Sequence, residues 1–438
     1  MRLAVVLALL AGLLGAAPAG AVDRYVPMKA PPAPGPSKYD KVFVQQLGPR
    51  KARNVLVLVP GTNGGAGGIT PVARDIARRV PTTQVWVVDR REQAFEDTAV
   101  FAQRDPDAAL DHYLGFKYRS VKGANARFVA DWGLEVQLND LRSVVRRASK
   151  GGRRVVLGGH SAGASTAVAY AAWDFGGRAG WRGLDGLVLI DGGLLGSFEE
   201  ASPERVRREL ADIRKGNVFF DLLGFGVPEI AGIFAQVGAL YAYERPDAPS
   251  TLQTLPLLPA QFKPPFPVTN EAALGYAFDE TTSPQALALI RIRAGGLARS
   301  GDPRPWRDGE ITPIRRFARA YSADAPNATE WYYPRRLLLD FDAASDLRMD
   351  KAAKLLGLRL EHGREIDLPL YAFSTDLTKG RVARGARRLA RISPIHKPVV
   401  VDDRRTSHLD PLSAAPETNH FLETVVPFLK RLSAARPR

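Results

Sequence analysis

The stretch that decides the fold runs from Arg153 to Gly163 and reads Arg-Arg-Val-Val-Leu-Gly-Gly-His-Ser-Ala-Gly. Val155 to Leu157 form a short apolar run typical of a buried parallel strand, and Ser165 to Trp173 continue as an alanine-rich segment typical of a helix. Ser161 lies between them, inside a Gly-x-Ser-x-Gly pattern. The stretch therefore predicts a strand, a sharp turn and a helix, with a serine at the turn.

Two glycines flank this serine and make so tight a turn possible. Gly159 and Gly163 have no Cβ atom to collide with the neighbouring strand and helix, so Ser161 can take a strained conformation that leaves its hydroxyl clear. The helix after the turn points its free N–H groups and positive dipole end at the place where negative charge would develop during acyl transfer. Ser161 is the candidate nucleophile.

Strand-like and helical segments alternate on both sides of this turn, which indicates an α/β fold with a mostly parallel sheet flanked by helices. From about Leu194 the rhythm breaks for a long stretch rich in proline, aromatic residues and helical segments, and it resumes at Leu368. The predicted strands are Asn54–Pro60, Thr83–Asp89, Arg153–Leu157, Leu187–Gly193, Leu368–Ser374 and Pro398–Val401, and Lys41–Gln46 could be a first strand before them.

Candidate partners of Ser161 follow it along the chain. His408 lies in a loop after the last predicted strand and could take the serine proton as a general base. Asp376 lies just past the strand that ends at Ser374, and we expect it to orient His408. Asp191, at the end of an earlier strand, is the alternative acid, and His420 is the competing histidine, although it falls on the predicted final helix.

The chain order Ser161, Asp376, His408 on a Gly-x-Ser-x-Gly turn resembles that of the α/β-hydrolase superfamily, in its secreted lipase and esterase-like branch. The resemblance covers residues 54–190 and 368–432. It implies the α/β-hydrolase fold with a large, mainly helical inserted cap. It also implies a serine hydrolase that cleaves carboxylic esters through an acyl-enzyme intermediate, with no cofactor and no metal.

The resemblance also implies an oxyanion hole built from two backbone N–H groups, those of Thr62 and Ala162, with Asn63 as a substitute for Thr62. The family often has a histidine where this chain has Pro60, just before the glycine-rich loop. The proline removes a side-chain anchor for that loop while leaving its backbone donors.

The sequence divides into five expected parts: a signal peptide at residues 1–21, a proline-rich leader at 22–40, the first part of the core at 41–193, an inserted cap at 194–367, and the second part of the core at 368–438. The apolar run near the N-terminus and the small residues after it predict export, to the extracellular space or the periplasm. We expect the cap to cover the mouth of the site and to favour an apolar acyl or aryl group.

The formal net charge is +15, and the chain contains no cysteine, which excludes disulfides and a cysteine nucleophile. The basic residues occur in short groups, which is compatible with weak contact with an anionic membrane or cell-wall surface. No zinc spacing or recognition-helix pattern suggests a nucleic-acid partner. The run Asp340, Asp342, Asp346 and Asp350 lacks the third ligand and the glycine of a calcium loop. Because Asp342, Asp346 and Asp350 are four residues apart, we expect them to form a solvated helix face.

Two alternatives to an esterase stay open from the sequence. A secreted serine peptidase would use the same catalytic residues, since amides and esters are cleaved by one mechanism. A non-catalytic protein could use the same fold to bind a lipid-like ligand. The oligomeric state cannot be read from the sequence.

Overall fold

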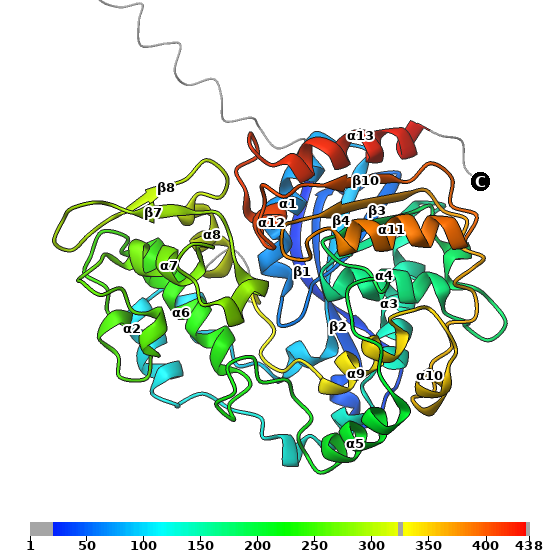
Figure 1. Cartoon of the computed structure of the whole chain (residues 1–438), viewed down its shortest axis with the longest axis horizontal. Coiled ribbons are helices and arrows are strands. Elements are labelled where there is room, and N and C mark those ends of the chain that lie inside the picture. Colours follow the sequence, from blue (N-terminus) through cyan, green and yellow to red (C-terminus); the bar gives the residue numbers. More distant parts are fainter. Residues whose placement is uncertain (1–20, 323–326, 435–438) are drawn as a thin grey trace, which may run out of the picture.

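The structure is a computed structural model that describes residues 21–322 and 327–434. The predicted signal peptide, apart from Ala21, lies outside the described residues. An eight-stranded sheet runs through the molecule in the order β1-β2-β4-β3-β5-β6-β9-β10 (Figure 1). Its strands are β1 (Ala21–Lys29), β2 (Lys41–Pro49), β3 (Asn54–Val59), β4 (Thr83–Asp89), β5 (Arg154–His160), β6 (Gly186–Ile190), β9 (Leu370–Ser374) and β10 (Val399–Asp402).

The strands from β4 to β10 pair in parallel, whereas β2 pairs antiparallel with β4, and β1 pairs antiparallel with β2. The predicted mostly parallel sheet is confirmed. The helices are α1 (Ala66–Arg79), α2 (Pro106–Ala109), α3 (Leu134–Ala148), α4 (Ala162–Ala172), α5 (Pro203–Arg214), α6 (Ile230–Glu244), α7 (Asn270–Phe278), α8 (Ile314–Ser322), α9 (Arg335–Ala344), α10 (Lys351–Leu355), α11 (Arg381–Ile392), α12 (Asp410–Ser413) and α13 (His420–Ala434).

Helices cover both faces of the sheet, and β3 shows why its sequence is apolar throughout. Successive side chains of a strand point to opposite faces. Val55 and Val57 belong to the cluster that includes residues of α3, α4 and α11, whereas Leu56 and Leu58 belong to the cluster that includes residues of α1 and α13. A strand buried on both faces needs an apolar side chain at every position.

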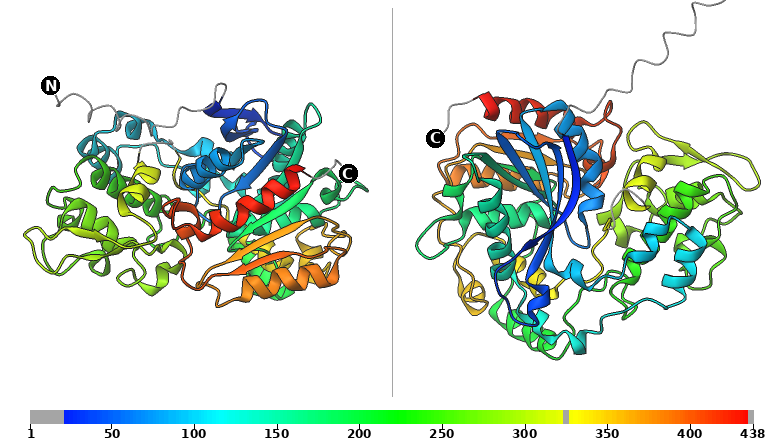
Figure 2. Two further views of the ribbon diagram at one scale, coloured as in Figure 1. Left: turned by 90° about the horizontal axis from the view of Figure 1, so that it is seen from above. Right: turned by 180° about the vertical axis from the view of Figure 1, so that it is seen from behind.

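The chain leaves the sheet after β6 and returns at β9, and the stretch between them contains α5 to α10 and the two-stranded sheet of β7 (Gly295–Leu297) and β8 (Trp306–Asp308). This stretch does not form one body. Helices α6, α7 and α8 with β7 and β8 form a lobe beside the sheet, whereas α5, α9 and α10 lie below it in Figure 1, and Figure 2 shows the same separation from two other sides.

The lobe also contacts residues that precede β5 in the sequence. The Tyr241 hydroxyl on α6 donates to Asp107 on α2 over 2.6 Å, and the Tyr118 hydroxyl donates to Glu229, next to α6, over 3.0 Å. The segment between β4 and α3 therefore packs with the lobe, although the sequence predicts it as part of the core at 41–193.

The prediction that residues 22–40 form a leader outside the fold is wrong for residues 22–29. Residues 22–29 belong to β1, which pairs with β2 along its whole length. Tyr25 stacks on Phe43 with ring centroids 5.5 Å apart, and its hydroxyl donates to Asp89 over 2.9 Å. The proline-rich residues 30–36 form no helix or strand, as their composition predicts.

The expected solvated helix face of Asp342, Asp346 and Asp350 is also wrong, because α9 ends at Ala344. Asp340 is buried and accepts from the Leu134 N–H over 2.6 Å, whereas Asp350 caps α10 through the Ala353 N–H. Among the residues that the structure describes, no helix has the length and apolar character needed to cross a bilayer.

Candidate active site

Ser161 lies between β5 and α4 in a strained conformation, with φ 53° and ψ −122°. A residue with a Cβ atom rarely adopts such a φ, and strained residues of this kind concentrate at functional sites. Gly159 and Gly163 permit the turn, because a Cβ on either would collide with backbone atoms, and for Gly163 the nearest is the Val59 carbonyl oxygen. The predicted strand, turn and helix are confirmed.

Asp191 follows β6 directly and lies next to the serine turn. The Ser161 N–H donates to the carbonyl of Ile190 over 2.8 Å, and Gly192 packs so closely on Ser161 that a Cβ there would collide with its backbone. The Asp191 Oδ2 lies 2.6 Å from His408 Nδ1, and both side chains are buried. The structure therefore brings the alternative acid, the histidine and the serine into one group.

The Asp191 carboxylate is also held by Thr375, whose N–H donates to Oδ1 over 2.8 Å and whose hydroxyl donates to Oδ2. Burial by itself would raise the pKa of Asp191, but the hydrogen bonds from His408 and Thr375 outweigh burial and keep the pKa below its ordinary value. Asp191 is thus an ionised acceptor for His408 Nδ1, which leaves Nε2 as the ring atom for proton exchange.

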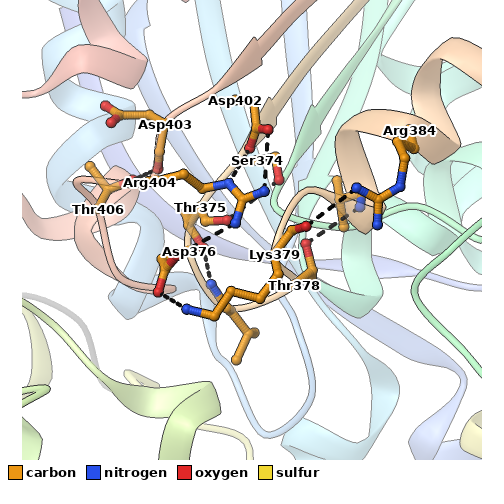
Figure 3. Close-up of polar contacts among 12 residues, drawn as sticks. Ser374, Thr375, Asp376, Thr378, Lys379, Arg384, Asp402, Asp403, Arg404 and Thr406 are labelled. Carbon is orange, nitrogen blue, oxygen red and sulfur yellow. Dashed lines mark hydrogen bonds and ion pairs between the residues drawn. The ribbon is translucent and has the colours of Figure 1, made fainter.

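The prediction that Asp376 orients His408 is wrong. Figure 3 shows the Asp376 side chain facing Lys379 and Arg404, and Arg404 Nη1 lies 3.5 Å from its Oδ1. The hydrogen bond from Lys379 lowers the pKa of Asp376. The reason lies one residue earlier, because the first residue after β9 is Thr375 and this residue meets the Asp191–His408 pair. Asp376, next along the chain, turns to the surface.

Two other histidines have clear positions. His160 is buried beside His408, with ring centroids 4.3 Å apart, and its Nε2 lies 2.9 Å from the His408 carbonyl oxygen. Burial, together with His408, lowers the pKa of His160 to about 3, so this ring is neutral and Nε2–H donates to the carbonyl. His420 instead pairs with Asp403 over 2.6 Å, at the start of α13.

The loop that carries His408 is tied to the inserted stretch through Asp410. Its carboxylate accepts from the Ser407 N–H over 2.7 Å, from the Arg293 N–H over 2.9 Å and from the Thr312 hydroxyl over 2.7 Å. The Leu409 N–H also donates to the Arg291 carbonyl over 3.0 Å. Residues 291–312 therefore fix the position of the histidine loop.

The glycine-rich loop after β3 contacts the nucleophile directly, since a Cβ on Gly61 would lie 2.9 Å from the Ser161 Cβ. The Gly64 N–H donates to the Gly61 carbonyl over 3.2 Å, which closes a turn with Asn63 at φ 54°. Within the described part of the chain, no backbone acceptor takes the N–H of Thr62 or Asn63. These N–H groups are therefore free of backbone partners within the described residues.

A cavity of about 390 Å³ opens beside Ser161 and is lined by Ser161, Asp191, His408 and the predicted oxyanion residues Thr62 and Ala162. The opposite walls come from the inserted stretch and are mainly apolar. Among the described residues that line this cavity, none is Lys, Arg or Glu, and Asp191 is the single Asp. A cavity of this size and character suits an uncharged small molecule.

No protein-family model matches the chain, and no curated protein matches it. A proposed lipase from Sulfolobus solfataricus is similar in structure, with a TM-score of 0.53 and 16% identity over 94% of this chain and 95% of that one. An epoxide hydrolase from Vigna radiata has a TM-score of 0.45 and 12% identity, covering 94% of this chain and 98% of that one. A thermophilic esterase from Thermogutta terrifontis has a TM-score of 0.41 and 13% identity, covering 94% of this chain and all (100%) of that one.

The strand order and the structural similarity to the Sulfolobus solfataricus protein show that this chain has the α/β-hydrolase fold. This is the fold that the resemblance of the motifs implies. Within it, Ser161 and His408 both line the cavity, and the carboxylate beside His408 comes from the end of β6 and not from beyond β9.

Proposed function

We propose that this protein is a secreted hydrolase that cleaves carboxylic esters, with Ser161 as nucleophile, His408 as general acid and base, and Asp191 as the residue that orients His408. The observation that carries the proposal is the buried 2.6 Å contact between His408 Nδ1 and Asp191, on a cavity that also contains the strained Ser161. Secretion rests on the predicted signal peptide at residues 1–21.

In the proposed reaction, the Ser161 Oγ attacks the ester carbonyl carbon while His408 Nε2 takes the hydroxyl proton. The electron pair of the carbonyl moves onto its oxygen, where the N–H groups of Ala162 and Thr62 stabilise the negative charge. When this intermediate collapses, the C–O bond to the leaving group breaks and His408 returns the proton to the alcohol. Water then attacks the acyl-enzyme by the same route and releases the acid.

Asp191 supports both proton transfers from a fixed position. Its bond to Nδ1 selects the tautomer that presents Nε2 to the serine, and its charge stabilises the imidazolium that forms. The hydrogen bonds from Thr375 keep this carboxylate ionised and oriented while it is buried. Because Asp191 is buried away from solvent, its interaction with His408 is stronger than it would be in water.

The cavity walls favour an uncharged, apolar acyl or aryl group. Phe198, Phe234, Leu274 and Phe278 of the inserted stretch line the cavity, and the lining residues that the structure describes include no cationic side chain to bind a carboxylate or phosphate. When an apolar group enters this cavity, the binding free energy becomes more favourable by about 25 cal/mol for each Å² of apolar surface removed from water. Nitrophenyl esters of neutral short-chain and medium-chain acids are the substrates to test first.

Labelling with a fluorophosphonate tests the proposal, because the reagent reacts with an activated serine. We expect the label on the peptide that contains Ser161 and not on Ser197, an unactivated serine that lines the same cavity. Ser161→Ala should remove the label and lower kcat for nitrophenyl butyrate by a factor on the order of 10⁶ while the protein stays folded. An unlabelled wild type that binds the ester without turnover would support the binding-protein alternative, and faster cleavage of a matched amide would support the peptidase.

A further inference from the structure

Arg90, the residue after β4, contacts the glycine-rich loop that follows β3 and contains Thr62. Its Nη2 donates to the Pro60 carbonyl over 2.6 Å and lies 3.4 Å from the Gly61 carbonyl oxygen. The side chain is 2% exposed. Burial by itself would lower the pKa of Arg90, but Glu330 and Tyr333 outweigh burial and raise the pKa above its ordinary value. A permanently charged, fork-shaped donor therefore holds two successive carbonyls of the loop.

The geometry of the peptide bond makes this contact relevant to the oxyanion hole. A trans peptide is planar, so the C=O of one residue and the N–H of the next point in opposite directions. The carbonyl of Gly61 and the N–H of Thr62 belong to one peptide unit. A guanidinium that holds the Gly61 oxygen on one side therefore directs the Thr62 N–H to the other side and opposes a flip of that unit.

Glu330 of the inserted stretch contacts both Arg90 and the glycine-rich loop. Its carboxylate pairs with Arg90 Nη1 over 2.6 Å, and its own side chain is 3% exposed. The backbone of the same residue brackets the turn, because the Glu330 N–H donates to the Asn63 carbonyl over 2.9 Å and Asn63 Nδ2 donates to the Glu330 carbonyl over 3.1 Å. The loop is thus clamped between a core arginine and a glutamate of the insert.

We propose that Arg90 is a positioning residue for catalysis, which orients the Gly61–Thr62 peptide so that the Thr62 N–H faces the oxyanion, and that Glu330 keeps the guanidinium in place. This inference rests on the proposed ester hydrolysis at Ser161. It also accounts for Pro60, because the anchor that a histidine side chain would supply at that position comes here from Arg90 through backbone carbonyls.

Arg90→Lys is the sharpest variant, because it keeps the charge beside Glu330 and loses the fork that binds two carbonyls. We expect kcat for nitrophenyl butyrate to fall about 100-fold, comparable to the loss of one oxyanion donor, while KM changes by less than about threefold. A trifluoromethyl ketone with a butyl chain should bind about 100-fold more weakly, because Ser161 attacks its carbonyl and the resulting oxyanion occupies the same hole.

Arg91→Lys is the matched control. Arg91 is the next residue, is 1% exposed and pairs with Asp140 over 2.6 Å, but its hydrogen bonds go to Asp140, Asp40 and the Pro31 carbonyl and not to the loop. We expect this variant to keep kcat, KM and ketone affinity within about threefold of wild type. A general loss of stability would affect both variants, whereas a misdirected Thr62 N–H would affect Arg90→Lys alone.

The inference is overturned if Arg90→Lys retains ketone affinity within about threefold of wild type, or if Arg91→Lys causes an equal loss. Should Arg90→Lys lack a cooperative unfolding transition, Glu330→Gln tests the same point, with an expected parallel fall of about tenfold in kcat and ketone affinity. Unchanged values there would likewise contradict the inference. Failure of the proposed function looks different, because wild type would then show neither turnover nor fluorophosphonate labelling at Ser161.

Discussion

The two halves of the cavity differ in what they contribute to the site. The sheet half contains Ser161, Asp191 and His408, which are polar, closely packed and placed at or after strand ends. The half from the inserted stretch contributes no Asp, Glu, Lys or Arg among the described residues that line the cavity. Under the proposed function, this difference implies a division of work in which the sheet supplies the chemistry and the insert selects the substrate.

The two halves are nevertheless joined at both catalytic loops. Residues 291–312 hold the histidine loop through Asp410 and Leu409, and residues 327–330 hold the glycine-rich loop through backbone bonds to Asn63, Gly65 and Gly67. An insert attached in this way cannot move as a whole without disturbing the loops that contain Thr62 and His408, the proposed oxyanion donor and base. A substitution in the insert should therefore change substrate selection without changing catalysis only where the residue lines the cavity and contacts neither loop.

The largest expected effect separates the two carboxylates. Asp191→Asn should lower kcat by roughly 10⁴, because an amide at this position favours the wrong histidine tautomer. Asp376→Asn should leave kcat within about threefold of wild type, because its partners are Lys379 and Arg404. Steady-state kinetics with nitrophenyl butyrate measures both variants. A greater loss in Asp376→Asn would return that residue to the catalytic group.

A smaller effect is expected where the insert alone forms the wall. Ala235 on α6 lines the cavity and is partly buried, so Ala235→Trp should fill part of the space. We expect kcat/KM for an octanoyl ester to fall by roughly 10- to 100-fold, in line with the cost of losing one or two methylene sites. The acetyl ester serves as the internal control and should change by less than about threefold. Equal losses on both esters would show that the walls and the chemistry are not separable.

The last expected effect is on stability and concerns the junction of the two halves, where Glu92 is fully buried near Glu330. Burial, followed by the Glu330 carboxylate, raises the pKa of Glu92 from 4.5 to about 8. A carboxyl whose pKa is higher in the folded state stabilises the fold fully below pH 4.5, and this stabilisation is lost as the pH rises through 8.

Glu92→Gln removes this titration and should flatten the pH dependence of the free energy of unfolding between pH 5 and 8. The pH slope of the free energy of unfolding should change by up to about 1.4 kcal/mol per pH unit, which corresponds to one proton. Urea unfolding at several pH values measures it, and Glu200→Gln, at an exposed position, is the control. Parallel slopes for wild type and Glu92→Gln would contradict the prediction.

The parts of the site that are local in sequence could be predicted from it. Ser161 between Gly159 and Gly163, and the Thr62 and Ala162 positions beside it, follow from one strand, one turn and one loop. His408 could be found because a histidine in the loop after the last strand must lie at the carboxyl edge of a parallel sheet. His160 and Arg90 carried no such signal, because their roles depend on carbonyls that only the folded chain brings to them.

By itself, the sequence determined the α/β fold and pointed to Ser161 and His408 as the proposed nucleophile and base, because strand periodicity, glycine at a crowded turn and strand-end loops are properties of short segments. Only the tertiary structure decided which carboxylate pairs with His408. Asp191 and Asp376 both follow parallel strands, β6 and β9, and the choice depends on which side chain the register of these neighbouring strands presents to His408. Thr375 occupies the position after β9 and donates to Asp191, which in turn pairs with His408. Asp376, one residue later, pairs instead with Lys379 and Arg404.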